Sequence, residues 1–475
     1  MTKTLLFEGT VDRSLKVETP YVYLSFTVPE GTTRVDVRYR YDEGNEIDIG
    51  LFDPECEAFP SRRGFRGWSG TVRSSFFVAE DEATPGYLPG KIPAGEWRVM
   101  LGLYRLAVTP CNYRVEIGFD ASPRKLVAPI APTSPVRPGA GWYRGDLHSH
   151  THHSDAPGTV ADLAEAARSR GLDFLAVTDH NTDSHHRQLA EASSSELLLL
   201  PGQEVTTYRG HANVWGVDGW VDFRVLEPSQ LDALVDQVHE RGGLFSINHP
   251  KAIGYDWEYP VPAGTDCFEA WQAPWSYKNW QSLARFDTLL RQGRRLSLVG
   301  GSDRHQPPQP DPDPELLQVG TPTTWLWLES LSVPDVLAGL RSGRAFVSEG
   351  PSGPRLEVFV NDAVMGAVLA DHRGESVQAR ATVQGAQGDR LRWVGAAGVL
   401  REVVIPSEAY EDRWEWRPAG PFIRAEVVAQ LEPAWIKAVA EQLERLGKLP
   451  KDLDLDEVVA QPVIRALSNP VYLGV

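Results

Sequence analysis

The chain has 475 residues, of which 42% are hydrophobic and 23% charged, a composition typical of a globular protein with about two or three domains. A formal net charge of −17 argues against long nucleic acids as the main partner, because no surplus of cations is left to neutralise phosphates. We expect no signal peptide and no membrane partner, since Glu8 ends the first short apolar run and no later run is long enough to span a bilayer. The scattered cysteines Cys56, Cys111 and Cys267 predict reduced thiols, a cytoplasmic location and no cysteine-based zinc site.

Residues 1–120 alternate between apolar and polar side chains, with Pro and Gly between the runs. Runs of period two, such as 21–28 and 96–104, predict an antiparallel β-sandwich. This part has no histidine, so we expect a structural role, with carbohydrate binding as the alternative. Residues 121–141 contain five prolines and predict a stiff, extended linker.

From residue 142 to about 350, short apolar runs alternate with helical patterns. Thr159 and Asp162 predict a capped helix start. Buried strands are predicted at 173–178, 196–200, 244–247, 267–271 and 296–302. This alternation predicts an α/β fold, a distorted, TIM-like β/α barrel with irregular connections.

Residues 351–475 return to period two and predict a second, smaller β-sandwich, with a helical insertion near 433–460. We expect the two sandwiches to pack together on one flank of the barrel and to support it without supplying metal ligands. The first 141 residues contain no histidine, and after His305 only His372 remains.

Metal-binding residue types follow one predicted strand after another. The run 145–155 contains His148 and His150, which a strand would direct to the same side. Later strands are followed by more such residues, namely His180, Glu204, His249, Asp303 and His305. In a β/α barrel these positions line the carboxyl-terminal mouth, where active sites are built. The sequence therefore predicts a metal site there.

The motifs resemble those of the PHP (polymerase and histidinol phosphatase) family of metal-dependent phosphoesterases over about 142–350. They are Asp146-Leu-His148-Ser-His150 with Asp155, Thr-Asp-His180-Asn, Gly-Gln-Glu204, His211, Asn-His249-Pro and Gly-Gly-Ser-Asp303-Arg-His305. The segments 320–325 and 466–472 are similar to the CehA/McbA branch of metallohydrolases, named for carbamate-insecticide hydrolysis.

The resemblance implies three divalent metal ions. The first would bind His148, His150, Glu204 and Asp303. The second would bind His211, His249 and a bridging oxygen of Glu204, and the third Asp155, His180 and His305. Imidazoles and carboxylates without thiolates suit Zn, Mn or Fe.

The same resemblance implies catalysis through a hydroxide held between two metal ions, with Glu204, Asp303 and His305 as the catalytic residues. Asp179, next to a ligand, would orient an imidazole. Four further histidines in this part (His152, His153, His185 and His186) are expected to face solvent or to support the ligands.

Four residues are candidates for binding substrate. Lys251 and Arg304 flank ligands and could bind substrate oxygens, or could form salt bridges instead. His152 could protonate the leaving group, as could a metal-bound water. Trp271 belongs to the aromatic-rich stretch 254–280, which would either wall a pocket for a base or aryl group or pack the barrel against a sandwich.

These observations predict a phosphoesterase that hydrolyses small phosphate monoesters or diesters, including nucleotides. The alternative is a hydrolase of aryl carboxylic esters or carbamates that uses the same metal-bound hydroxide. A binding module without activity is disfavoured, because all nine ligand positions are retained. The expected partner is thus a small anionic or aryl ester substrate.

Overall fold

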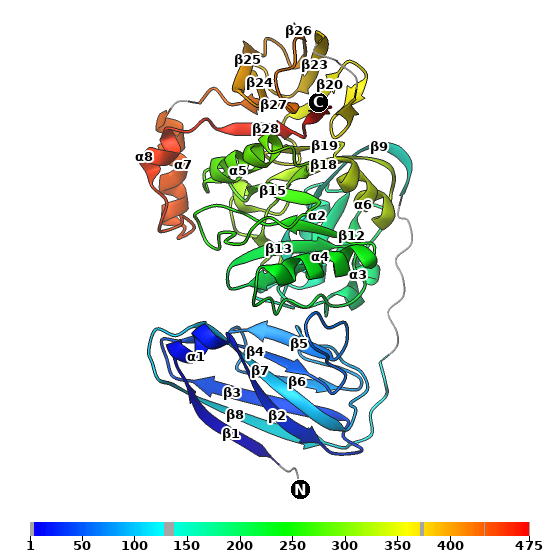
Figure 1. The fold of residues 1–475 in the computed structure, drawn as a ribbon, viewed down its shortest axis with the longest axis vertical. Helices are drawn as coiled ribbons and strands as arrows, with labels where there is room; N and C mark the ends of the chain where they lie inside the picture. Colours follow the sequence, from blue (N-terminus) through cyan, green and yellow to red (C-terminus); the bar gives the residue numbers. More distant parts are fainter. Residues whose placement is uncertain (1–3, 128–136, 371–374, 432, 475) are drawn as a thin grey trace.

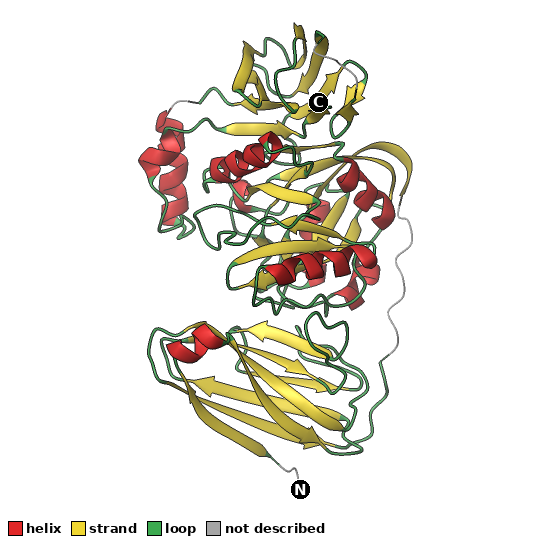
Figure 2. Ribbon diagram, in the orientation of Figure 1, coloured by secondary structure: helices red, strands yellow, loops and turns green. Residues whose placement is uncertain are grey.

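The computed structural model describes residues 4–127, 137–370, 375–431 and 433–474. It is a mixed α/β structure, elongated, with many strands and few helices (Figures 1 and 2). The N-terminal strands lie at one end, a central α/β part follows, and the C-terminal strands lie at the other end (Figure 1). Among the described residues, no helix has the length and apolar character needed to cross a membrane.

The N-terminal part consists of two antiparallel sheets of four strands. One has the order β1 (Leu5–Val11), β8 (Cys111–Asp120), β3 (Arg34–Tyr41) and β6 (Ser75–Ala79). The other has the order β2 (Tyr21–Val28), β7 (Gly95–Arg105), β4 (Glu46–Phe52) and β5 (Phe65–Gly70). A short helix, α1 (Arg13–Glu18), joins β1 to β2. Alternation along the strands directs residues such as Val35, Trp97 and Val115 into one shared apolar core.

The central sheet departs from a regular TIM-like repeat. Parallel pairs join β9 (Arg137–Asp146), β11 (Phe174–Val177) and β12 (Leu198–Thr207), and likewise β14 (Leu244–Ile247), β15 (Cys267–Gln272) and β16 (Ser297–Gly301). Between these sets, β13 (Gly210–Trp215) is antiparallel to both β12 and β14. The tight turn between Thr207 and Gly210 leaves no room for a crossover helix, which only parallel neighbours require.

The sheet also curls back on itself. Antiparallel β18 (Thr323–Leu331) pairs with β9 and with β19 (Ala345–Ser348), and β16 lies against both β18 and β19. The two-residue strands β10 (Ser149–His150) and β17 (Arg304–His305) pair in parallel beyond β9 and β16. The ends of the first and last central strands therefore come together.

Helices cover the outside of this sheet (Figure 2). They are α2 (Val160–Ser169), α3 (His186–Ala192), α4 (Ser229–Glu240), α5 (Asn279–Arg291) and α6 (Val333–Ser342), with a 3-10 turn at Glu315–Leu317. The predicted start of α2 is confirmed. Thr159 Oγ1 accepts a hydrogen bond from Asp162 N at 3.1 Å, and Thr159 N donates to the Asp162 carboxylate at 2.9 Å. Such a cap stabilises a helix by about 1 kcal/mol.

The C-terminal strands continue the central sheet. Strand β28 (Ile464–Ser468) pairs with both β19 and β27 (Phe422–Val428), and the sheet runs on through β24 (Arg390–Gly395) and β25 (Gly398–Val404). A separate sheet has the order β21 (Ala363–Val364), β20 (Arg355–Val360), β23 (Val377–Gln384) and β26 (Ala409–Trp416). The remaining elements are β22 (Val368–Leu369), β29 (Val471–Leu473), α7 (Pro433–Arg445) and α8 (Leu455–Val459).

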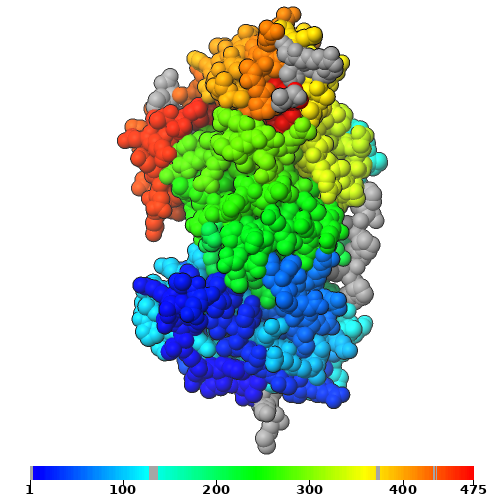
Figure 3. Space-filling model, in the orientation of Figure 1, coloured from blue at the N-terminus to red at the C-terminus, as the bar shows by residue number. Residues whose placement is uncertain are grey.

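The prediction that the two terminal β parts pack together on one flank is wrong, because they lie at opposite ends of the molecule (Figures 1 and 3). The C-terminal strands extend the edge of β19, whereas the N-terminal sheets cover loops that follow the central strands. Residues 128–136 of the predicted linker lie outside the described residues, as does His372. Strand β9 begins at Arg137, within the last part of the predicted linker. The predicted domain limits stay predictions.

Candidate metal centre

The nine predicted ligands come from loops and strand ends on one side of the central sheet. His148 follows β9, His180 follows β11, His249 follows β14 and Asp303 follows β16. The β12–β13 hairpin carries Glu204 and His211, β10 and β17 carry His150 and His305, and Asp155 precedes α2. The structure brings all nine side chains into one continuous cluster.

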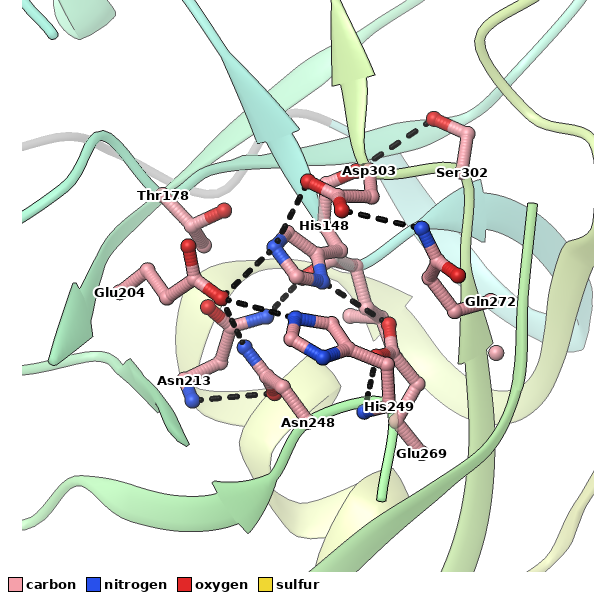
Figure 4. A network of polar contacts seen from close by, with 12 residues as sticks. His148, Thr178, Glu204, Asn213, Asn248, His249, Glu269, Gln272, Ser302 and Asp303 are labelled. Carbon is pink, nitrogen blue, oxygen red and sulfur yellow. Dashed lines mark hydrogen bonds and ion pairs between the residues drawn. The ribbon is translucent and has the colours of Figure 1, made fainter. Parts of the chain in front are cut away.

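Glu204 contacts more of these imidazoles than either of the other two carboxylates, and Figure 4 shows its contacts with His148 and His249. Its Oε1 atom is 3.3 Å from each of three ring nitrogens, His148 Nε2, His211 Nδ1 and His249 Nε2. Its Oε2 atom is 2.7 Å from His180 Nδ1, and the side chain is 1% exposed. One buried carboxylate is therefore shared by imidazoles from four separate segments.

Two further carboxylates extend the cluster. Asp303 Oδ1 lies 2.9 Å from His150 Nε2 and 3.3 Å from His148 Nε2. Asp155 Oδ1 lies 3.1 Å from His305 Nε2 and 3.7 Å from His180 Nε2. The His150 ring is 4.4 Å, centroid to centroid, from the rings of both His180 and His305. Asp303 and Asp155 thus face the same group of imidazoles from two sides.

The ionisation of these groups suits metal ligands. Burial opposes ionisation of Glu204, but the imidazoles of His148, His180 and His211 hold its pKa well below the usual range. Burial and the neighbouring His180 and His305 lower the pKa of His150 to about 4, so its ring is neutral at physiological pH. His148 Nε2 and Glu204 Oε2 are buried, and their close contacts within the cluster are ion-pair contacts that lack hydrogen-bond geometry. Such orphaned atoms, in a set of imidazoles and carboxylates, fit divalent cations.

Among the described residues, four sets of potential ligand atoms lie within 4.8 Å of one another. They are His150, Asp155, His180 and His305; His148, His150 and Glu204; His180, Glu204 and His211; and His148, His249 and Glu269. The three ligands predicted for the third metal, Asp155, His180 and His305, all belong to one set, which also contains His150. The predicted second-metal histidines do not share one, because His249 falls with His148 and Glu269.

Glu269 is a functional candidate that the sequence reasoning missed. Its Oε1 atom is 2.9 Å from His148 Nδ1, and its Oε2 atom accepts a hydrogen bond from His249 N at 2.8 Å. It therefore fixes two candidate ligands at once. The available signal was a single charged residue inside the apolar strand Cys267–Trp271.

Asp146 and Asn248 support the cluster in the same way. Asp146 is fully buried and accepts hydrogen bonds from His148 N (3.1 Å), Ser302 N (2.9 Å) and Gly320 N (2.7 Å). Asn248 Nδ2 donates to Glu204 Oε1 at 2.9 Å (Figure 4). The aspartate lies in the quoted motif, yet the sequence reasoning gave it no role.

The backbone is strained at the positions that present these side chains. His249 (φ 30°) and Asp303 (φ 51°) both adopt left-handed backbone two residues after the end of a strand. Gly301 lies so close to His148 that a Cβ atom there would be 2.4 Å from the His148 Cβ. Asp303 therefore reaches His148 only because position 301 carries no side chain.

Three of the four predicted substrate-binding residues are engaged by other protein groups. Arg304 forms ion pairs with Asp311 (2.6 Å) and Asp313 (2.8 Å), the alternative considered for this residue. Lys251 is buried, which lowers its pKa to about 7, and its ammonium donates to Asn279 Oδ1 at 2.8 Å. Trp271 is buried and lines a separate cavity of about 510 Å³ beside α7 and α8.

The histidines outside the nine are mostly buried rather than solvent-facing. His153 Nδ1 lies 2.7 Å from Ser184 Oγ, and His186 Nε2 lies 3.0 Å from the Gly202 carbonyl. Asp179 orients an imidazole, that of His185 at 3.1 Å, which is not a candidate ligand. His152, the fourth predicted substrate residue, is half-buried in the same loop.

Comparison with known proteins places the resemblance in this part of the chain. Residues 146–249 match the model of the PHP domain. A probable phosphatase from Aeromonas salmonicida is 36% identical over 106 residues, which are 21% of this chain and 41% of that protein. The DNA polymerase/3'-5' exonuclease PolX of Bacillus subtilis is 28% identical over 96 residues, 20% of this chain and 15% of that protein. The chain thus spans less than half of the length of these relatives.

A two-domain protein from Bacteroides vulgatus that contains a predicted PHP-like metal-dependent phosphoesterase is similar in structure. It is 16% identical, with a TM-score of 0.36, and the match covers 64% of this chain and 95% of that one.

Proposed function

We propose that this protein is a metal-dependent phosphoesterase that hydrolyses small phosphate monoesters or diesters, nucleotides included. The observation that carries the proposal is the Glu204 carboxylate, whose Oε1 atom lies 3.3 Å from three imidazole nitrogens in a buried cluster. A buried carboxylate shared in this way suits a bridge between metal ions.

The cluster would hold three divalent ions, of Zn, Mn or Fe, through the nine residues named above. When bound, such ions activate water and neutralise charge that develops on the phosphoryl oxygens. Cys267 and the other two cysteines are buried and unpaired, and none belongs to the potential ligand sets. Free thiols are in keeping with the cytoplasmic location that we propose.

The chain's own residues have distinct roles in this proposal. Glu204 and Asp303 hold the ions and keep neighbouring imidazoles in place. Glu269 and Asn248 orient His148, His249 and Glu204. His305, with a side chain 38% exposed, is open to substrate at the edge of the cluster.

A second candidate is hydrolysis of aryl carboxylic esters or carbamates at the same site. The Tyr255 ring stacks on His211 at 4.7 Å between centroids, which brings an aromatic surface next to the cluster. The resemblance of segments 320–325 and 466–472 to the CehA/McbA branch favours the same candidate.

The test is to load the protein with Zn, Mn or Fe and to assay p-nitrophenyl phosphate, bis-p-nitrophenyl phosphate and naphthyl esters side by side. We expect the phosphate esters to be cleaved faster. Glu204→Gln should lower kcat by about a hundredfold or more, whereas the matched surface variant Glu165→Gln, in an exposed ion pair on α2, should not. Faster cleavage of the naphthyl esters would favour the second candidate, and no cleavage of any substrate would refute both.

A further inference from the structure

A small cavity lies between the N-terminal sheets and the metal cluster. Its volume is about 150 Å³. From the cluster side it is lined by the candidate ligands Asp155, His180 and His211. From the other side it is lined by residues of the N-terminal part, among them Trp68 and Val72. A molecule that occupied this cavity would therefore touch both the candidate metal ligands and the N-terminal sheets.

The N-terminal sheets are fixed against the cluster by specific contacts. Tyr208, in the hairpin that carries Glu204 and His211, donates its hydroxyl to Asp48 Oδ2 of β4 at 2.8 Å. The contact depends on Gly102 of β7, where an added Cβ would lie 2.1 Å from the Tyr208 hydroxyl oxygen.

Two other contacts hold the same arrangement. Arg73 donates to the carbonyls of His152 and Ser154 (3.1 Å to Ser154), in the loop that leads to Asp155. Phe65 of β5 stacks on Trp220 with ring centroids 4.4 Å apart and planes 3° apart. The N-terminal part is therefore a fixed wall of the cavity and not a tethered neighbour.

The cavity wall is mainly aromatic. The rings that line it are Tyr21, Trp68, Tyr104, Tyr208, Phe223 and Tyr255. Neighbouring rings contact one another, with centroids 5.7 Å apart for Tyr21 and Tyr208 and 5.6 Å apart for Tyr104 and Tyr208. The hydroxyl groups of Tyr104, in the N-terminal part, and Tyr255, in the central part, are hydrogen-bonded to each other. The two parts are therefore joined at the wall of the cavity. Such a wall favours a flat, apolar group.

We propose that this cavity is the substrate's ring subsite, which accepts one six-membered aromatic ring of the ester while the phosphate lies at the metal cluster. The inference rests on the proposed function and names its substrate class, single-ring aryl esters. The volume fits one ring, because an apolar cavity of about 150 Å³ holds one benzene molecule. The N-terminal β part would then contribute to recognition, beyond the purely structural role expected from its lack of histidine.

The experiment narrows the cavity from its exposed edge. Val72 is 52% exposed, so Val72→Trp adds bulk at the cavity without disturbing a core. Leu6→Trp is the matched control, because Leu6 is 50% exposed on β1, which lies at the far end of the N-terminal part (Figure 1). The metal-loaded full chain is assayed with phenyl phosphate and methyl phosphate, and calorimetry measures the binding of phenylphosphonate and methylphosphonate.

We expect wild type and Leu6→Trp to prefer the phenyl compounds, and Val72→Trp to lower the phenyl-to-methyl ratio of kcat/KM by about tenfold, a difference that matches removal of one ring contact. An unchanged ratio in Val72→Trp would overturn the inference and leave the proposed function intact. If wild type cleaves neither of these monoesters nor bis-p-nitrophenyl phosphate, the proposed function fails and calorimetry decides the inference. Weaker phenylphosphonate binding by Val72→Trp than by Leu6→Trp would then support it, and equal binding would overturn it.

Discussion

The side chain of Asn469 hydrogen-bonds to the backbone of Leu298 as a neighbouring strand would. Its Oδ1 atom accepts from Leu298 N at 2.7 Å, and its Nδ2 atom donates to the Leu298 carbonyl at 2.8 Å. The same Nδ2 atom reaches the Ala345 carbonyl at 3.2 Å. One buried carboxamide therefore joins the edge of β16 to β19, two strands that do not pair through backbone hydrogen bonds in the described part of the chain.

Replacing this carboxamide should weaken the whole fold. Asn469→Ala leaves buried backbone groups of Leu298 without partners, so we expect the free energy of unfolding to fall by about 2–4 kcal/mol. Asn112→Ala, at an exposed position, should change it by less than about 1 kcal/mol. Urea unfolding of both variants measures the difference, and equal losses would contradict this role of Asn469.

Removal of metal should destabilise the protein as well as inactivate it. Ions that bind the folded cluster stabilise it by mass action, and their loss leaves the carboxylates and imidazoles around Glu204 uncompensated. We expect chelation to lower Tm by several degrees in wild type and in Glu165→Gln, and by much less in Glu204→Gln. The measurement is thermal unfolding before and after dialysis against a chelator, with the metal content determined in parallel. An identical drop in Tm for all three proteins would show that Glu204 does not hold the ions.

Glu204 and Lys251 should differ in what they contribute. Glu204→Gln is expected to lose both metal and activity, as a bridging ligand would. Lys251→Ala removes an ammonium that donates hydrogen bonds to Asn279 Oδ1 and to the Gln272 carbonyl. Its main effect should therefore be a lower free energy of unfolding, with a smaller effect on kcat. Activity and bound metal are measured for both variants. Equal losses of activity would mean that Glu204 does not bridge.

Glu269 should act on metal affinity through His148. Glu269→Gln keeps the shape of the side chain but removes the charge beside His148 Nδ1, so we expect metal to bind about 10–100 times more weakly. Glu258→Gln is the control, since its side chain is 62% exposed and pairs with Arg209. Competition with a chromogenic chelator gives both affinities. If Glu269→Gln bound metal as tightly as wild type, Glu269 would not support metal binding.

Asp48 should make stability depend on pH. Its pKa is raised from 3.8 to about 7, chiefly by burial, while Glu46 adds to the rise and Tyr208, His180 and Lys16 oppose it. The folded state therefore binds a proton that the unfolded state has released, and this stabilisation is lost as pH rises from about 4 to about 7. Relative to Asp48→Asn, wild type should lose up to about 4 kcal/mol of unfolding free energy over this range. Urea unfolding at pH 5 and pH 8 tests it, and parallel changes in the two proteins would contradict it.

The sequence predicts most local structure because local patterns determine it. The capping residues Thr159 and Asp162 set the start of α2, and the apolar run 244–247 sets strand β14 at its observed limits. The spacing of His148, Glu204 and the later ligands after strands likewise indicated that they would meet. These signals are all read within a few residues.

The parts that were not predicted depend on contacts between distant segments. No local signal places Asp48 beside Tyr208, since that contact needs the gap at Gly102 and the docking of two whole sheets. The antiparallel hairpin β12–β13 was missed because its strands are buried on both faces, as parallel strands are, and so lack the alternation of a half-exposed antiparallel strand. The opposite positions of the terminal β parts follow from β28 pairing with β19, which sequence periodicity does not encode.

The place of β28 in the sheet has a consequence for synthesis on the ribosome. Strand β19 ends at Ser348, but its partner β28 begins at Ile464, so both the edge of β19 and that of β27 stay unpaired while the intervening residues are translated. Open edges with apolar faces readily pair with the wrong chain. The nascent protein therefore passes through a long interval in which both edges are open to mispairing, and slow translation after Ser348 would lengthen that exposure.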